Sequence, residues 1–353
     1  MPKLFNQTYT PAELRRLTGT LDQLAGIRLV EYADGKARGL RAADVYTGSG
    51  FRFTVWLDRS MDIGPAEFAG KPLAWLHPAL GTPAQYEPAG AGWLRTFGGG
   101  LMTTGGMTHI GAPDQEGGEA FGVHGRGSHL PAQAVAAHCG WNGDTYELVL
   151  EGQVRQSVLF GENLLLIRRI TTKLGASSLR IDDRLINEGY QPVNPMLLYH
   201  CNFGFPVVSR DTELVVDDLD VRPRDPAAAA GLGQQNTFQP PDPDYAEQVF
   251  FHQVRPEADG FATASLINRA IDFGAYVRYR TAELPILVQW KMMGAGAYIV
   301  GLEPATNPLA PRQALRQAGL LKTLAPGEEM SFAVEIGALA GNGVPAESGR
   351  NAG

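Results

Sequence analysis

Cysteine and membrane-type segments are nearly absent from this 353-residue sequence. It contains only two cysteines, Cys139 and Cys201. Two such distant cysteines form neither a disulfide framework nor the paired spacing of a structural zinc site. The N-terminal stretch MPKLFNQTYTPAEL has no apolar core of a secretory signal, and no apolar run is long enough to cross a bilayer. We therefore expect a cytoplasmic protein without a membrane segment.

Positive charge is also scarce. The sequence has 30 Lys and Arg against 37 Asp and Glu, which gives a net charge of -7, and its basic residues form no run. This balance argues against nucleic acid and anionic membranes as partners. We find no nucleophile elbow, phosphate loop or dinucleotide fingerprint. The sequence thus predicts no cofactor.

What the sequence does contain is β-type patterning. Hydrophobic residues make up 44% of the chain, and 43 Gly and 24 Pro are spread along it as turns. Apolar and polar residues alternate with a period of two, as in half-buried strands. Strands are expected at residues 51–57, 146–155, 164–172, 179–186, 273–280 and 286–292. Because strand follows strand with few helices between, we predict an all-β fold, a large antiparallel β-sandwich with a few short helices.

The chain divides into one domain with two short ends. Residues 1–25 are predicted to be a helical segment packed on the domain, where Thr10 caps a helix, Pro11 occupies its first turn and Glu13 closes a capping box. Residues 26–340 are expected to form a single sandwich domain, and residues 341–353 a flexible tail.

Two stretches inside the domain are expected to be long surface excursions. One, around residues 220–245, is rich in Pro, Ala, Gly and Gln. The other, at residues 98–127, is rich in Gly and carries His109 and His124. Long Gly-rich loops on a β scaffold often hold binding sites.

Three stretches carry residues suited to chemistry. GVHGRGSH (122–129) places His124 and Arg126 between glycines, which let a ligand approach the backbone. MLLYHCNFGFP (196–206) is an apolar, strand-like run that contains His200, and a polar group buried there is costly unless it has a partner. GLEPATNP (301–308) follows an apolar run with Glu303, in a position where a base could be held rigidly.

Each stretch also has a structural interpretation. His124 and His129 could cap turns, His200 could be a core histidine bonded to a backbone carbonyl, and Glu303 could be a surface carboxylate at a strand end. A zinc site could be assembled from His109, Glu119, His124 and His129, but their spacing matches no known ligand motif, and we predict no metal. The roles of His109 and His129 stay open.

Taken in order, the motifs resemble those of the aldose 1-epimerase (galactose mutarotase-like) superfamily, and in particular its less characterised bacterial branch, long labelled a domain of unknown function. The matching stretches span nearly the whole chain. They are LDRSMDIG (57–64), GGLMTTGG (99–106), GVHGR (122–126), LLYHCNFGFP (197–206), GLEPATNP (301–308) and RQALRQAGLLKTLAPGEEMSF (312–332).

The resemblance implies a β-sandwich with a sugar cleft on the concave face of one sheet. It places His200 at the position of the general acid that protonates the ring oxygen, and Glu303 at that of the base that takes the anomeric proton. His124 falls where a second histidine orients the sugar. Additional sugar ligands are expected to be Arg126, Arg95, Asn202 and Trp290. An acid and a base on opposite edges of one sugar can open its ring without metal or cofactor.

Two departures from the pattern concern the substrate. Better known mutarotases have Asn before the second histidine, where this chain has Tyr199, and a small residue where it has Arg126. An extra arginine could favour an acidic or phosphorylated sugar, or could only hold its loop.

The leading interpretation is an aldose 1-epimerase-like isomerase acting on a free monosaccharide. The alternatives are a related sugar epimerase or isomerase acting at another carbon, and a carbohydrate-binding protein without turnover. The sequence does not give the sugar, and it is compatible with a homodimer.

Overall fold

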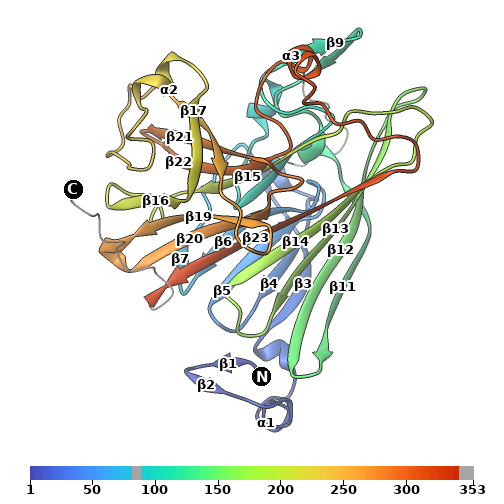
Figure 1. Ribbon diagram of the computed structural model, residues 1–353. Coiled ribbons are helices and arrows are strands. Elements are labelled where there is room, and N and C mark those ends of the chain that lie inside the picture. Colours follow the sequence, from blue (N-terminus) through green and yellow to red (C-terminus); the bar gives the residue numbers. More distant parts are fainter. Residues whose placement is uncertain (82–88, 342–353) are drawn as a thin grey trace.

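The structure is a computed structural model that describes residues 1–81 and 89–341. Two large antiparallel sheets pack face to face (Figure 1). The predicted fold class, a large antiparallel β-sandwich with a few short helices, is confirmed. Residues 342–353, which make up most of the predicted tail, lie outside the described residues.

The first sheet carries the chemistry described below. Among the described residues it has 11 strands. In spatial order these are β17 (Asp218–Pro223), β18 (Gln248–Val254), β21 (Ile286–Gly294), β22 (Ala297–Ala305), β15 (Met196–Phe203), β8 (Met102–Met107), β6 (Asp62–Phe68), β5 (Phe51–Trp56), β4 (Arg41–Tyr46) and β3 (Gly26–Glu31), with β7 (Lys71–Pro72) paired to β6.

The second sheet supplies the opposite wall of the core. In the described part of the chain it has eight strands. Their order is β11 (Ala132–Asn142), β12 (Thr145–Ser157), β13 (Asn163–Lys173), β14 (Ser178–Asn187), β23 (Glu329–Ala340), β20 (Phe273–Arg280), β19 (Phe261–Asn268) and β16 (Thr212–Val216).

Helices and small hairpins connect and cover the sheets. The α-helices are α1 (Pro11–Leu17), α2 (Pro226–Ala230) and α3 (Arg312–Gln317). Short 3-10 helices are η1 (Leu21–Gln23), η2 (Gly35–Ala37), η3 (Gly92–Arg95), η4 (Gly127–His129) and η5 (Arg269–Ile271). The hairpins are β1 (Lys3–Leu4) with β2 (Gln7–Thr8), and β9 (Asp114–Glu116) with β10 (Glu119–Phe121).

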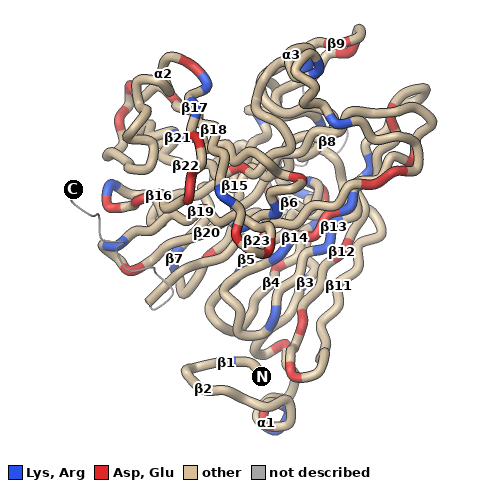
Figure 2. Tube along the Cα trace, in the orientation of Figure 1, with Lys and Arg blue, Asp and Glu red and all other residues tan. Residues whose placement is uncertain are grey.

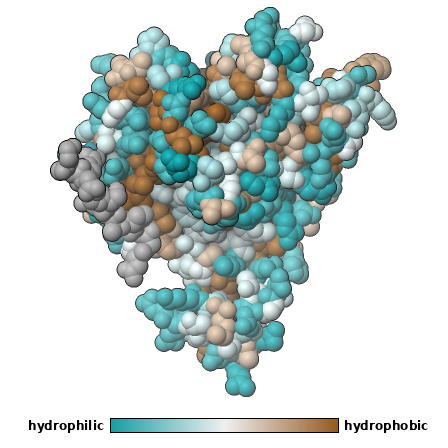
Figure 3. Space-filling view, in the orientation of Figure 1, coloured by the Kyte–Doolittle hydropathy of each residue, from teal (hydrophilic) through white to brown (hydrophobic). Residues whose placement is uncertain are grey.

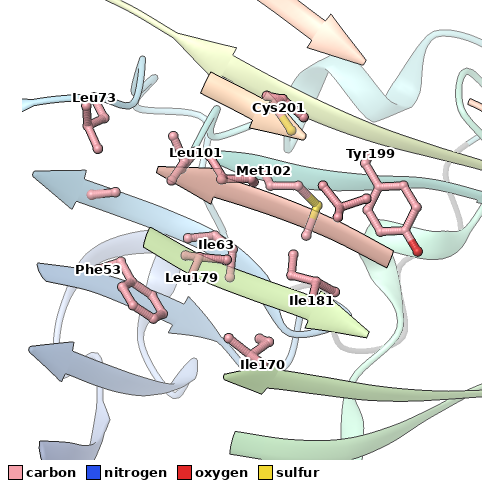
Figure 4. Packing of buried hydrophobic residues seen from close by; sticks show 14 of the residues in the cluster. Phe53, Ile63, Leu73, Leu101, Met102, Ile170, Leu179, Ile181, Tyr199 and Cys201 are labelled. Atoms are coloured by element: carbon pink, nitrogen blue, oxygen red, sulfur yellow. The ribbon is translucent and has the colours of Figure 1, made fainter. Parts of the chain in front are cut away.

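The main core lies between the two sheets, because each strand turns alternate residues inward. Figure 4 shows Ile63 and Met102 from the first sheet packed against Ile170 and Ile181 from the second. All four side chains are at most 2% exposed. The period of two in the sequence therefore marks the faces that pack.

A charged cluster is buried inside this apolar core. Arg168 on β13 donates two-pronged hydrogen bonds to Asp183 on β14, and the two side chains are fully buried. The hydroxyl of Tyr199, on β15 of the other sheet, donates to Asp183 at 2.7 Å. Arg168 also donates to the hydroxyl of Thr104 on β8, which in turn donates to Asp62 on β6. Hydrogen bonds at the hydroxyls of Tyr199 and Thr104 thus join the charged pair of the second sheet to the first sheet.

The N-terminal segment is only partly helical. Thr10 and Glu13 form the predicted capping box. However, α1 ends at Leu17, and the expected helical spacing continues only as the single turn η1. The segment also contains the β1–β2 hairpin. The division into an N-terminal segment of residues 1–25 packed on a domain of residues 26–340 stays a prediction.

The Gly-rich stretch 98–127 is not the simple loop that we expected. It contains β8, which pairs with β15 in the centre of the first sheet. The stretch 220–245 contains the end of β17 and α2, drawn in yellow in Figure 1. We call residues 224–247, which join β17 to β18, the arch.

The surface mixes both signs of charge. In Figure 2, acidic and basic residues are interspersed along the trace, side by side around α3 and β9. The space-filling view shows apolar surface on both sides of the notch between the lobes that carry α2 and α3 (Figure 3). Among the described residues, no helix has the length and hydropathy needed to cross a membrane.

The buried cluster predicts the effect of removing one hydroxyl. Tyr199→Phe leaves the buried Asp183 carboxylate with one donor fewer, and we expect it to lower the free energy of unfolding by about 2 kcal/mol. Urea unfolding followed by circular dichroism measures the change.

Tyr279→Phe is the matched control, because Tyr279 is equally buried but its hydroxyl makes no hydrogen bond to the described residues. Equal effects of the two substitutions would show that the cluster contributes nothing beyond packing.

Candidate active site

The centre of the candidate site is a histidine and a glutamate on neighbouring strands. β15 and β22 are antiparallel, and the pairing of Cys201 with Leu302 places His200 opposite Glu303. Cross-strand neighbours on one face lie close enough for their side chains to meet. Nε2 of His200 is 3.2 Å from Oε1 of Glu303, and both side chains are buried. The fold thus brings together the two residues predicted to act as acid and base.

The carboxylate of Glu303 is folded back along its own strand. Its Oε1 lies where a side chain at Gly301 would begin, since a Cβ there would be 2.3 Å away. Oε1 accepts no hydrogen bond from the described residues, because the approach of His200 is not aligned for one. Glu303 is buried and lies inside β22, so the alternative interpretation as a surface carboxylate at a strand end is wrong. A buried acceptor without a donor is costly, and a ligand hydroxyl would satisfy it.

His124 reaches the same place from the Gly-rich stretch. Its ring lies edge-on to that of His200, with ring centroids 5.4 Å apart. Its backbone is left-handed (φ 52°), a conformation that is rare outside glycine. Hydrogen bonds to Gly111 and from Gly106 hold this backbone. The N–H of Gly111 donates to Nδ1 of His124 at 3.3 Å, which leaves Nε2 of the neutral ring as a hydrogen-bond donor.

Aromatic side chains enclose His200. The ring centroid of Trp93, on η3, is 5.0 Å from that of His124 and 6.0 Å from that of His200. Phe97 stacks on Trp93 at 4.3 Å and lies 5.5 Å from His200. Trp290 on β21 meets His200 edge-on at 5.5 Å. Of these rings, only Trp290 was expected at the site.

Burial shifts the acid–base properties of the central pair in opposite directions. It lowers the pKa of His200 to about 4, an effect that the neighbouring Asn202 side chain partly offsets. It raises the pKa of Glu303 well above the usual range of a carboxyl group. Burial also lowers the pKa of His124 well below 6.5, helped by repulsion from His200. Each shift favours the uncharged form, so the pair favours a state in which neutral His200 faces a protonated Glu303.

Two charged residues of the arch lie at the rim of the site. Glu247 accepts a hydrogen bond from the indole N–H of Trp290 at 3.0 Å. Its other oxygen accepts one from Arg224 at 2.9 Å. Glu247 raises the pKa of Glu303, after burial the largest cause, and Arg224 lowers it. No sequence motif singled out either residue: Arg224 lies in the stretch 220–245 that we expected to be a surface excursion, and Glu247 lies just beyond it.

The other predicted sugar ligands differ in their surroundings. Asn202 is buried beside His200 and donates to the carbonyls of Gly100 and His200, while its Oδ1 has no partner among the described residues. Arg126 forms an ion pair with Glu119 at 2.9 Å. Arg95 is exposed on η3 and makes no hydrogen bond or ion pair within the described part of the chain. Their roles as sugar ligands stay predictions.

The remaining histidines of the Gly-rich stretch have partners of their own. His109 contacts the carbonyl of Ala112 at 2.6 Å. His129 contacts the hydroxyl of Thr96 at 2.6 Å, and burial lowers its pKa to about 3. In residues 1–81 and 89–341, no three His, Cys, Asp or Glu side chains are grouped as they would be around a metal ion.

Comparison with known proteins assigns the chain to a family. The family model described as "Domain of unknown function (DUF4432)" matches residues 37–338. The chain belongs to the DUF4432 family. No functionally curated protein matches it.

The structure of this DUF4432 chain is similar to solved structures that are named as sugar epimerases or mutarotase-like proteins. A Klebsiella pneumoniae protein provisionally called an aldose 1-epimerase has 26% identity and a TM-score of 0.85, over 91% of this chain and 86% of the other. A galactose mutarotase-like protein from Clostridium acetobutylicum has 12% identity and a TM-score of 0.62, over 90% and 100% of the two chains. Galactose 1-epimerase from Lactobacillus acidophilus has 13% identity and a TM-score of 0.58, over 90% and 99%. The predicted membership of a DUF branch of the aldose 1-epimerase superfamily is confirmed.

The surroundings of His200 predict an unusually low titration midpoint. NMR of the labelled imidazole should show a midpoint near pH 4, where an ordinary histidine has a pKa of 6.5. Because the unfolded chain then binds more protons than the folded one between about pH 4 and 6.5, this residue makes stability fall as the pH drops through that window. The exposed His138 provides a reference signal. A midpoint at or above 6.5 would mean that His200 is solvated or paired with a stable carboxylate.

Proposed function

We propose that this protein is an aldose 1-epimerase-type isomerase that interconverts the anomers of a free monosaccharide. The observation that carries the proposal is the pair of His200 and Glu303, buried, 3.2 Å apart, and with an acceptor oxygen left unpartnered among the described residues. A protein that only binds sugar has no need for a matched acid and base in one place.

The pair supports ring opening by coupled proton transfer. Burial favours the state in which Glu303 holds the single proton of the pair, and transfer of that proton to His200 gives the reactive state. Glu303 is then a carboxylate and takes the proton of the C1 hydroxyl. The bond between C1 and the ring oxygen breaks, a carbonyl forms at C1, and the ring oxygen takes the proton of His200. Each group reacts in the form that its task requires, and the pair keeps one proton throughout.

Closure on the other face completes the reaction. The open-chain aldehyde turns about the C1–C2 bond and presents its opposite face. The hydroxyl that was the ring oxygen attacks C1 as it returns its proton to His200, and the carbonyl oxygen takes the proton from Glu303. The pair ends in its starting state. The Nε2–H of His124 supports both halves, because it can donate to a sugar oxygen without changing charge.

The charges around the pair favour a neutral sugar. Glu303 and Glu247 contribute two carboxyl groups near the site, and Arg224 is already paired with Glu247. Arg126, which could have selected an acidic sugar, is paired with Glu119. These carboxyl groups would repel the negative charge of an acidic or phosphorylated sugar brought next to Glu303.

Removal of the proposed base tests the reaction. Glu303→Gln keeps the size of the side chain but cannot accept a proton, so anomer exchange should fall by on the order of 100- to 10,000-fold. Proton NMR saturation transfer on a panel of aldoses measures exchange, and ligand-induced shifts measure binding. Glu151→Gln is the control, because Glu151 is a half-buried glutamate on the second sheet that pairs with Arg169. Sugar binding with no exchange in the wild type would point to a binding protein instead.

The same panel tests the substrate class. Exchange of glucose and galactose should be faster than that of glucuronic acid and glucose 6-phosphate, because the anionic sugars meet the carboxyl groups of the site. Raising the salt concentration should narrow the difference by screening the charges. A preference for the anionic sugars would contradict this account of the site's charge.

A further inference from the structure

The arch makes unusually regular contact with strand β21. Three consecutive residues of this strand each donate a hydrogen bond to it. Gln289 donates to the carbonyl of Gln235 at 2.7 Å, and Lys291 to that of Gln234 at 3.0 Å. Between them, Trp290 donates to Glu247 at 3.0 Å. Gln289 and Lys291 face the inside of the sandwich, while Trp290 faces the site, so the arch is tied to both faces of β21.

The two ends of the arch are held together at the site. Arg224 follows β17 and Glu247 precedes β18, and these strands form an antiparallel hairpin. The side chains of Arg224 and Glu247 are 2.9 Å apart. The backbone N–H of Arg224 donates to the carbonyl of Val249 at 2.9 Å. Glu247 is therefore placed by the hairpin and the ion pair, independently of any ligand.

Through Trp290, this carboxylate reaches the catalytic pair. Trp290 is opposite Gly301 in the β21–β22 register, next to the position where the carboxylate of Glu303 lies. Its ring is edge-on to that of His200. The indole N–H bond to Glu247 fixes the orientation of a side chain that touches the acid and flanks the base.

We propose that Glu247 is a positioning residue: held by Arg224, it orients Trp290 against His200 and adds a negative charge beside Glu303. The inference deepens the proposed function and rests on it for its kinetic consequences. It also gives the arch a role in the site, although the arch contributes no member of the acid–base pair.

The charged and titratable groups around the pair come from three elements. His200 and Cys201 lie on β15, and Cys201 interacts electrostatically with Glu303. Glu247 and Arg224 come from the arch. His124 comes from the Gly-rich stretch, and His200 lowers its pKa. Glu247 and Arg224 can be changed without altering the pair or His124.

Substitutions at the two ends of the arch should shift the pKa of Glu303 in opposite directions. Glu247→Gln removes a negative charge and should lower the pKa of Glu303, so that the alkaline limb of the activity profile moves to lower pH. Arg224→Met removes a positive charge and should raise that pKa, so that the limb moves to higher pH.

Glu247→Ala also removes the acceptor of the indole bond. We expect it to lower kcat between about 10- and 100-fold, the scale of a misplaced reacting group, and to shift the indole N–H signal of Trp290 upfield.

Asp217→Asn is the matched control. Asp217 forms an exposed ion pair with Arg255 at 3.1 Å at the other end of the same hairpin. Its loss should leave the pH profile and the Trp290 signal unchanged. NMR titration of Glu303 with labelled glutamate needs no substrate, so the positioning role can be decided even if no sugar is turned over and the proposed function fails.

Three results would overturn the inference. The first is an unchanged titration of Glu303 in both Glu247→Gln and Arg224→Met. The second is an unmoved Trp290 signal in Glu247→Ala. The third is a higher KM in Glu247→Gln with kcat and the pH profile unaltered, which would make Glu247 a direct sugar ligand.

Discussion

The structure depends on a buried hydrogen-bonded charge cluster that joins its two sheets. Removing Arg168 and Asp183 from water costs free energy, which is offset only because their donors and acceptors are matched within the cluster. Tyr199 joins the cluster from the opposite sheet. The next residue along β15 is His200. Because successive residues of a strand face opposite ways, the bond that draws Tyr199 inward turns His200 outward to the site.

The candidate site is therefore built mainly on strands. His200, Glu303 and Trp290 lie on three adjacent strands of one sheet, where neighbouring strands restrict their movement. Such placement holds reacting groups more exactly than loops do. The Gly-rich stretch adds His124 in a left-handed conformation, and the arch adds charge at the rim. Scaffold and site share the same hydrogen-bond ladders, so neither can be altered independently of the other.

Local pattern was enough to predict much of this arrangement. The period of two revealed the strands, and motif order brought His124, His200 and Glu303 to one site. Glycine misled us at β8, because it is depleted in strands. In β8, a side chain at Gly106 would collide with the carbonyl of Met196, so this strand requires glycine. The same glycine makes the sequence resemble a loop.

Sequence reasoning missed several residues near the site for a different reason. Trp93 on η3 and the arch residues Glu247 and Arg224 come close to His200 and Glu303 only through the long-range folding of the chain, which no spacing in the sequence records. The two departures from the superfamily pattern also acquire reasons only in three dimensions. Tyr199 belongs to the buried cluster, and Arg126 pairs with Glu119.

His200 and Glu303 face each other only when β15 and β22 pair in the correct register, so the proposed chemistry depends on correct strand pairing. If β22 slipped by one residue against β15, Glu303 would turn to the inner face of the sheet and Leu302 or Pro304 would take its place. A carboxyl group would then be forced into the apolar core and an apolar side chain would face the site. A chain with this error would lose both stability and the proton acceptor of the site. The position of Glu303 therefore disfavours the shifted register.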